Sequence, residues 1–178
     1  GDDTTVCVLK AVKPKKVKLF TGPPSHKEDD AKVVHELMNN ADIRIVSGGT
    51  TSQIVARELG VEVKSSTEIY DKEVPPIAYI QGVDLVTEGV LTLSKTIDRL
   101  KSLSKSLDSD IFKAKDGASQ MAKLLYSASH IKLLVGRSLN IANAESSFQR
   151  DLELRLHVVG ELEKILVKLG KIVTVEYY

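Results

Sequence analysis

Short apolar runs typical of strands alternate with helical patterns along most of this 178-residue chain. Each such helix returns the chain to the same end of a sheet, so consecutive strands run parallel to one another. The runs with strand character are residues 17–20, 42–46, 61–63, 77–87, 130–135 and 172–175. We therefore predict an α/β fold, a Rossmann-like open and mostly parallel sheet with helices on both faces.

Helical spacing of apolar residues fills the gaps between these runs. Helices are predicted over residues 27–39, from about 52 to 59, over 91–107, from Asp116 onward, and over 151–169. The run 77–87 is interrupted at Gln81-Gly82, which indicates one bulged strand or two short strands. Residues 64–76 are polar and end in prolines, which predicts an exposed loop.

The domain limits follow from two changes in composition. Residues 4–12 have strand character but stop at Lys13-Pro14, apart from the α/β units that run from residue 16 to 178. Cys7 lies in that strand pattern and is predicted to be a small core residue. Residues 101–112 are rich in serine and lysine, so either one continuous α/β domain or a subdomain joint near 101–112 fits the sequence.

Charge and cysteine content limit the partners. Lysine and arginine number 25 against 24 aspartate and glutamate residues, so no net field favours nucleic acid. No apolar run approaches the roughly 20 residues of a membrane span, and the one cysteine excludes an internal disulfide. These features favour a soluble, cytoplasmic protein that binds a small ligand or another protein. The chain starts at Gly1 within an acidic turn, as expected of a fragment from a longer protein.

The turn Ser47-Gly48-Gly49-Thr50-Thr51 follows a predicted strand and precedes a predicted helix. Backbone N–H groups and the helix dipole favour an anion at such a place, and the two glycines allow close approach. The same residues could also form a tight turn with a threonine N-cap. We predict a binding site for a phosphorylated or otherwise anionic small molecule.

Three more turns follow predicted strands and are expected at the same edge of the sheet. They contain Thr21 and Gly22, then Asp84 and Glu88, and then Arg137. Glu88 could orient a ribose, hold magnesium or act as a base, or it could only complement a helix dipole. Arg137 offers a planar donor fork for phosphate or carboxylate, or it is an ordinary surface arginine.

The first nine residues, Gly1-Asp2-Asp3-Thr4-Thr5-Val6-Cys7-Val8-Leu9, resemble the closing motif of metal-dependent serine/threonine phosphatases of the stage II sporulation protein E type (SpoIIE-like). The resemblance implies that residues 1–13 are the last strand of a phosphatase domain and that Asp2 is a ligand of its manganese or magnesium centre. The rest of that domain would lie upstream. No cofactor is evident in this chain itself.

The remainder resembles the C-terminal extension of such phosphatases from anaerobic bacteria. The runs that carry the resemblance are Leu19-Phe20-Thr21-Gly22-Pro23-Pro24, Val46-Ser47-Gly48-Gly49-Thr50-Thr51, Ile54-Val55-Ala56-Arg57-Glu58-Leu59-Gly60, Gly82-Val83-Asp84-Leu85-Val86-Thr87-Glu88-Gly89 and Gly170-Lys171-Ile172-Val173-Thr174-Val175. The family does not name a ligand for this extension.

Three functions fit these observations. In the first, residues 16–178 are a regulatory domain that senses an anion at Ser47–Thr51, with Glu88 and Arg137 completing the pocket, and acts on its own phosphatase domain. In the second, the domain is a separate enzyme that uses Asp84 or Glu88 as acid, base or magnesium ligand. In the third, it is an interaction module whose helix from Leu93 to Leu107 forms a homodimer or partner face.

Overall fold

The computed structural model describes residues 3–9, 11, 13–105, 110–138 and 145–178. In this part of the chain one sheet of seven strands has the order β3-β4-β5-β2-β1-β6-β7. The parallel strands are β1 (Lys16–Thr21), β2 (Ile43–Ser47), β5 (Leu85–Thr87), β6 (His130–Val135) and β7 (Ile172–Tyr177). The two-residue strands β3 (Lys64–Ser65) and β4 (Ala78–Tyr79) are antiparallel and extend the sheet beyond β5.

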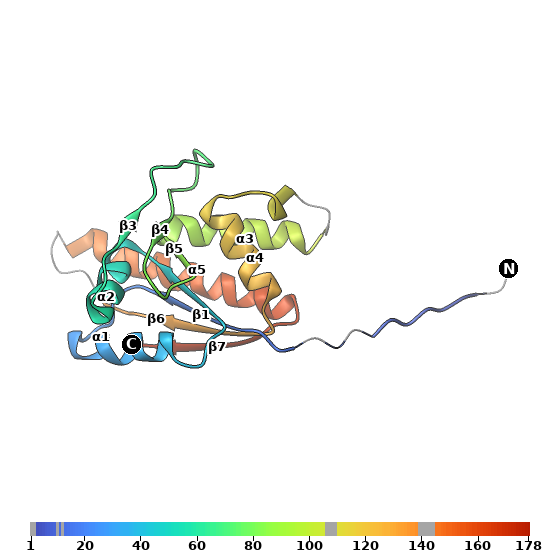
Figure 1. Ribbon diagram of the computed structural model, residues 1–178, viewed down its shortest axis with the longest axis horizontal. Coiled ribbons are helices and arrows are strands. Elements are labelled where there is room, and N and C mark those ends of the chain that lie inside the picture. Colours follow the sequence, from blue (N-terminus) through green and yellow to red (C-terminus); the bar gives the residue numbers. More distant parts are fainter. Residues whose placement is uncertain (1–2, 10, 12, 106–109, 139–144) are drawn as a thin grey trace.

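Helices cover both faces of this sheet (Figure 1). One face carries α1 (Asp30–Met38) and α2 (Gly49–Leu59), and the other carries α3 (Val90–Leu103), α4 (Gly117–Ser127) and α5 (Glu145–Lys168). Two short 3-10 helices, Lys27–Asp29 and Asp110–Phe112, precede α1 and α4. The fold is therefore the predicted Rossmann-like α/β sheet.

The alternating sides of the strands build two hydrophobic cores. Val17 and Leu19 of β1 pack toward α3, α4 and α5, whereas Phe20 packs toward α1 and α2. The larger core includes Leu93, Leu100 and Leu103 of α3 together with Met121 and Leu125 of α4. Because the helix after β1 and the helix after β6 lie on opposite faces, the strand order reverses between these two neighbours, which is the topological switch point of the sheet.

Local pairing departs from the sequence prediction on one side of the sheet. The strand predicted over residues 61–63 is absent, because pairing with β4 involves Lys64 and Ser65 instead. The run 77–87 forms the second of the two predicted arrangements, two short strands joined by a turn in which Val83 N–H donates to the carbonyl of Ile80. Residues 66–76 form an arm that projects from the body (Figure 1).

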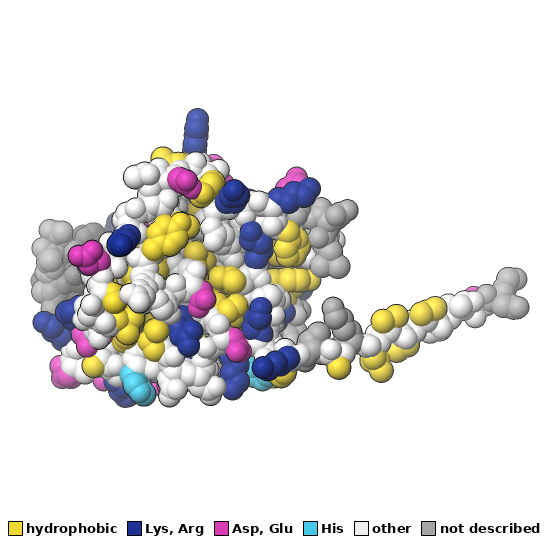
Figure 2. Space-filling view, viewed as in Figure 1, with side chains coloured by type: hydrophobic (Ala, Val, Ile, Leu, Met, Phe, Trp, Pro, Cys, Tyr) yellow, Lys and Arg dark blue, Asp and Glu magenta, His cyan; other side chains and the backbone are white. Residues whose placement is uncertain are grey.

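The described N-terminal residues extend away from the folded body (Figure 1). Asp3–Leu9 contain no strand, and Val6, Val8 and Leu9 are 78%, 83% and 93% exposed. Figure 2 shows hydrophobic side chains on this extended segment in contact with no other part of the chain on the visible face. The prediction that Cys7 is a core residue is wrong for this chain, because Cys7 is exposed and pairs with no strand of the described residues.

The predicted joint at 101–112 includes residues 106–109, which lie outside the described part of the chain. The helices on either side of it, α3 and α4, contribute to the same hydrophobic core. Leu103, near the end of α3, is only 2% exposed within that core.

Candidate functional site

Ser47 links the carboxyl end of β2 to the carboxyl end of β5 through its side chain. Its Oγ donates a hydrogen bond of 2.8 Å to the carbonyl oxygen of Glu88, and the hydroxyl of Thr87 donates to the same carbonyl at 2.9 Å. Both hydroxyl-bearing side chains are buried. Ser47 therefore holds the two strand ends together and does not present its hydroxyl to a ligand.

Gly48 lets the chain turn from β2 into α2. Its φ of 121° is a conformation that side chains with a Cβ rarely adopt, and a Cβ here would lie 3.0 Å from Oγ1 of Thr51. The N–H of Gly48 donates to the carbonyl of Thr87 at 2.9 Å. Thr51 is buried beneath this turn, whereas Gly49 and Thr50 are exposed.

The first turn of α2 has no side-chain cap at its N-terminus. Ser52 is the first residue of α2 whose N–H bonds back, to the carbonyl of Gly48 at 2.9 Å. The N–H groups of Gly49, Thr50 and Thr51 have no acceptor among the described residues, as expected for the first turn of a helix. The first turn of α2 is thus available to an acceptor from outside the helix.

The N-terminus of α3 lies beside that of α2. A Cβ built on Gly89 would lie 3.6 Å from Cα of Gly48, and Gly89 likewise gives α3 no side-chain cap. The positive ends of two helix dipoles therefore meet at one point, which strengthens the preference for an acceptor or negative group.

A cavity of about 220 Å³ adjoins this point, between α2 and the segment that leads into β4. Gly49, Gln53 and Glu88 line it on one side, and Ser65 and Ser66 on the other. Its further lining residues are Ser52, Val63, Pro75, Pro76, Ile77, Ala78, Val86 and Thr87. The glycine turn and Glu88, which we predicted to lie close together, both line this cavity. No sequence pattern pointed to Gln53, Ser65 or Ser66.

Thr21 and Gly22 lie at the switch point, in a separate environment. Thr21 is buried, and Gly22, with φ of 77°, packs under Arg155 of α5, whose Nη1 would lie 2.5 Å from a Cβ at residue 22. The N–H of Gly136 donates to the carbonyl of Thr21, so the backbone after β6 closes against the backbone after β1. The crevice that binds ligands in many such folds is filled here by the chain itself.

Arg155 is the cation at this closed switch point, and sequence reasoning did not single it out. Its Nη1 donates to the carbonyl of Gly136 at 3.2 Å. Burial lowers the pKa of its guanidinium, although Asp151 one helical turn earlier opposes the shift. Among the described residues no carboxylate lies within ion-pair distance of Arg155.

The other two predicted site residues lie apart from the glycine turn. The guanidinium of Arg137 lies 5.6 Å from the ring centre of Tyr177, next to β7 at the far side of the switch point. Asp84 precedes β5 and accepts a hydrogen bond of 2.7 Å from the N–H of Arg44, whereas Glu88 follows β5. The two carboxylates therefore lie at opposite ends of one strand, and the prediction that both follow it is wrong.

Neither a metal cluster nor a membrane helix is found in the described residues. No three side chains of His, Cys, Asp or Glu there converge as they would around a metal ion. No helix in that part has both the length and the apolar character needed to cross a bilayer. Asp2, the metal ligand implied by the phosphatase resemblance, lies outside the described residues.

Comparison with protein-family models, with curated proteins and with solved structures found no match to this chain. The resemblance to SpoIIE-like phosphatases therefore stays a prediction from the sequence motifs.

Proposed function

We propose that residues 16–178 are a ligand-sensing accessory domain of a SpoIIE-like serine phosphatase, and that they bind a small phosphorylated or otherwise anionic molecule at the start of α2. The observation that carries this proposal is the cavity shared by Gly49 and Glu88 beside a helix N-terminus without a cap. An anionic oxygen at this position accepts from the N–H groups of Gly49, Thr50 and Thr51.

Glu88 gives the proposed site its selectivity. Its exposed carboxylate lines the same cavity as Gly49 and would repel an anion that filled the whole space. A ligand with one anionic end and one hydroxyl-bearing end fits better, because the carboxylate can accept hydrogen bonds from hydroxyl groups. A sugar phosphate or a nucleotide has both ends.

In the enzyme alternative, Asp84 is disfavoured as the group that acts on the bound anion, because it precedes β5 and lies at the opposite end of that strand from the glycine turn. A partner face along α3 is disfavoured as well, because Leu93, Leu100 and Leu103 are buried against α4 and α5. Leu107, the last leucine of that predicted face, lies outside the described residues, and the interaction hypothesis stays a prediction. The resemblance to SpoIIE-like phosphatases adds one expectation to ligand binding, namely that the bound ligand controls an attached phosphatase domain.

The test is a thermal-shift measurement on the 178-residue protein with ribose 5-phosphate and inorganic phosphate as probes. A bound ligand at 100 times its Kd stabilises the folded state by roughly 2.7 kcal/mol, enough for a clear rise in Tm. Gly49→Asp should abolish the rise, because its carboxylate occupies the helix N-terminus. Gly49→Asn is the matched neutral control and should keep most of it.

Both variants should fold, because a Cβ at residue 49 has no neighbour within 4 Å. A rise in Tm that persists unchanged in Gly49→Asp would place the ligand elsewhere. The absence of any rise with either probe at 10 mM would overturn the proposed ligand class.

A further inference from the structure

We propose a second ligand site, for a nucleotide, in the groove between the projecting arm 66–76 and the segment that leads into α4. Two adjoining cavities of about 590 Å³ and 430 Å³ form this groove. They share Tyr70 of the arm with Lys113, Ala114 and Lys115 of the segment before α4. Each volume lies in the range of small-molecule sites, and the groove is distinct from the cavity beside α2.

The larger cavity is lined by more positive than negative side chains. Lys113, Lys115 and Lys123 line it together with a single carboxylate, that of Asp84. Asp84 is already engaged by the N–H of Arg44, and Lys123 is held by the carbonyl of Ala114 at 2.7 Å. Lys113 and Lys115 line both cavities. Lys113 lies 3.6 Å from Asp110, but this pair is exposed and weak, so both ammonium groups can still bind a phosphate.

Aromatic rings stand beside these lysines. Tyr70 and Tyr79 line the larger cavity and are 47% and 56% exposed. The ammonium group of Lys115 lies 6.0 Å from the ring centre of Tyr70, so ring and cation share one wall. Figure 2 shows Lys and Arg side chains interspersed with hydrophobic ones on the face where the arm and α4 lie. A flat base can stack on such rings while its phosphate reaches the lysines.

The smaller cavity has two polar atoms in its lining residues that the protein leaves unused. Oγ of Ser119, in a residue only 1% exposed, and Nε of Arg99 have no hydrogen-bond partner among the described residues. Buried donors without partners are rare, because each costs free energy that a partner would recover. Each atom has less than 1 Å² of accessible surface, so hydroxyl or phosphate oxygens of a nucleotide reach these donors only when the side chains around the cavity shift.

The acids of the smaller cavity already have partners. Asp71 accepts from Arg99 Nη2 at 3.2 Å, Asp116 accepts from the N–H of Ser119 at 2.9 Å, and Asp110 lies 3.6 Å from Lys113. Their negative charge is thus partly neutralised within the protein. Among the described lining residues, the buried groups without a partner, on Ser119 and Arg99, can both donate, which favours a ligand rich in acceptors.

The experiment is calorimetric titration of the 178-residue protein with AMP, and with adenosine and inorganic phosphate as partial ligands. AMP should bind, and adenosine should bind at least about tenfold more weakly because it lacks the phosphate. The double variant Lys113→Gln/Lys115→Gln should weaken AMP binding by a similar factor. Lys27→Gln/Lys168→Gln removes the same charge from exposed positions outside the groove and should leave AMP binding unchanged.

Ser119→Ala separates a binding role from a structural one. Because the Ser119 hydroxyl has no partner among the described residues, its removal should leave Tm unchanged or slightly higher, yet it should weaken AMP binding several-fold.

Equal affinities for adenosine and AMP would overturn the phosphate role of the lysines, and no heat with AMP at millimolar concentration would overturn the site. Loss of AMP binding in Gly49→Asp would assign the nucleotide to α2 instead, so the two proposals can fail independently.

Discussion

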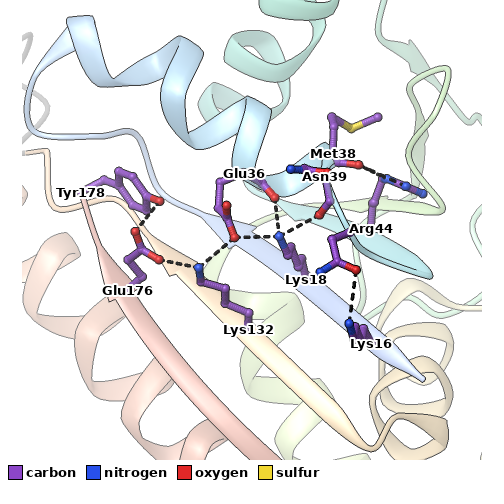
Figure 3. A network of polar contacts seen from close by, with 10 residues as sticks. Lys16, Lys18, Glu36, Met38, Asn39, Arg44, Lys132, Glu176 and Tyr178 are labelled. Carbon is purple, nitrogen blue, oxygen red and sulfur yellow. Dashed lines mark hydrogen bonds and ion pairs between the residues drawn. The ribbon is translucent and has the colours of Figure 1, made fainter. Parts of the chain in front are cut away.

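The ammonium group of Lys18 donates a hydrogen bond of 2.7 Å to Oε1 of Glu36, across the interface between β1 and α1 (Figure 3). Lys18 also donates to the carbonyls of Glu36 and Asn39, so all three of its N–H donors have acceptors. The same Glu36 oxygen accepts from Lys132 of β6 at 2.8 Å. A lysine side chain only 10% exposed is tolerated on the sheet face because the network satisfies it fully.

Glu36→Gln should therefore destabilise the fold although it changes the shape of the side chain very little. It leaves the buried charge of Lys18 without its anion, and breaking a buried pair costs about 3–5 kcal/mol. Because Glu36 is 30% exposed, water weakens its interaction with Lys18, and we expect a smaller loss. The free energy of unfolding, measured with urea, should fall by about 1–3 kcal/mol. Glu28→Gln removes an exposed acid near the same helix and should change stability by less than about 0.5 kcal/mol. Equal effects of the two changes would show that the pair contributes nothing.

The same network makes stability depend on pH. Hydrogen bonds from Lys132 and then Lys18 hold the pKa of Glu36 below its usual 4.5. A carboxylate with a lowered folded pKa contributes stability that is present above its unfolded pKa and is lost as pH falls through the folded one. The Tm difference between the natural protein and Glu36→Gln should therefore be constant near neutral pH and shrink below about pH 4.5. A difference that stays constant down to pH 3 would contradict this linkage.

The parts of the fold that the sequence predicted are those that depend on local patterns. Strand and helix periodicity, turn glycines and the stop at Gly60 predicted the units β1-α1, β2-α2 and α5-β7, and the mostly parallel class followed from their alternation. Gly49 and Glu88 were predicted to lie close together because they follow neighbouring parallel strands, and both line one cavity; their role in ligand binding stays a prediction.

The parts that could not be predicted depend on contacts between distant residues. Nothing near residue 64 in the sequence indicates that β3 pairs with β4, and nothing near Arg155 places it above Gly22. Lys18 breaks the apolar pattern of β1, but only the fold supplies Glu36 and the two carbonyls that allow it. Asp84 was misplaced because β5 is only three residues long and begins after it.

Closure of the switch point predicts that Gly136 accepts no side chain. A Cβ at residue 136 would lie 2.2 Å from the carbonyl oxygens of both Gly22 and Pro23, which are backbone atoms and cannot turn aside. Gly136→Ala should cost several kcal/mol, enough to unfold a domain of ordinary stability near room temperature. Circular dichroism during urea titration measures the loss.

Gly160→Ala is the matched control for that prediction. Gly160 lies within α5, where a Cβ meets nothing within 4 Å, so the alanine should stabilise the protein by about 0.5–1 kcal/mol through helix propensity. If both alanines had small effects, the loops after β1 and β6 would have to separate readily, and the switch point would be open to ligands after all.

The extended N-terminal segment predicts an accessible thiol at Cys7, the one cysteine of the chain. Its neighbours Val6 and Val8 are 78% and 83% exposed, so the described part of the chain leaves the sulfur accessible. A disulfide reagent such as DTNB should modify one thiol per chain in the native protein, at the rate found in urea. In a longer protein that carries the proposed phosphatase domain, residues 4–12 would become a paired strand and the same thiol should react at least about tenfold more slowly. Slow reaction in the 178-residue protein would mean that the segment packs on the α/β domain, and fast reaction in both proteins would contradict its assignment as a strand of the phosphatase.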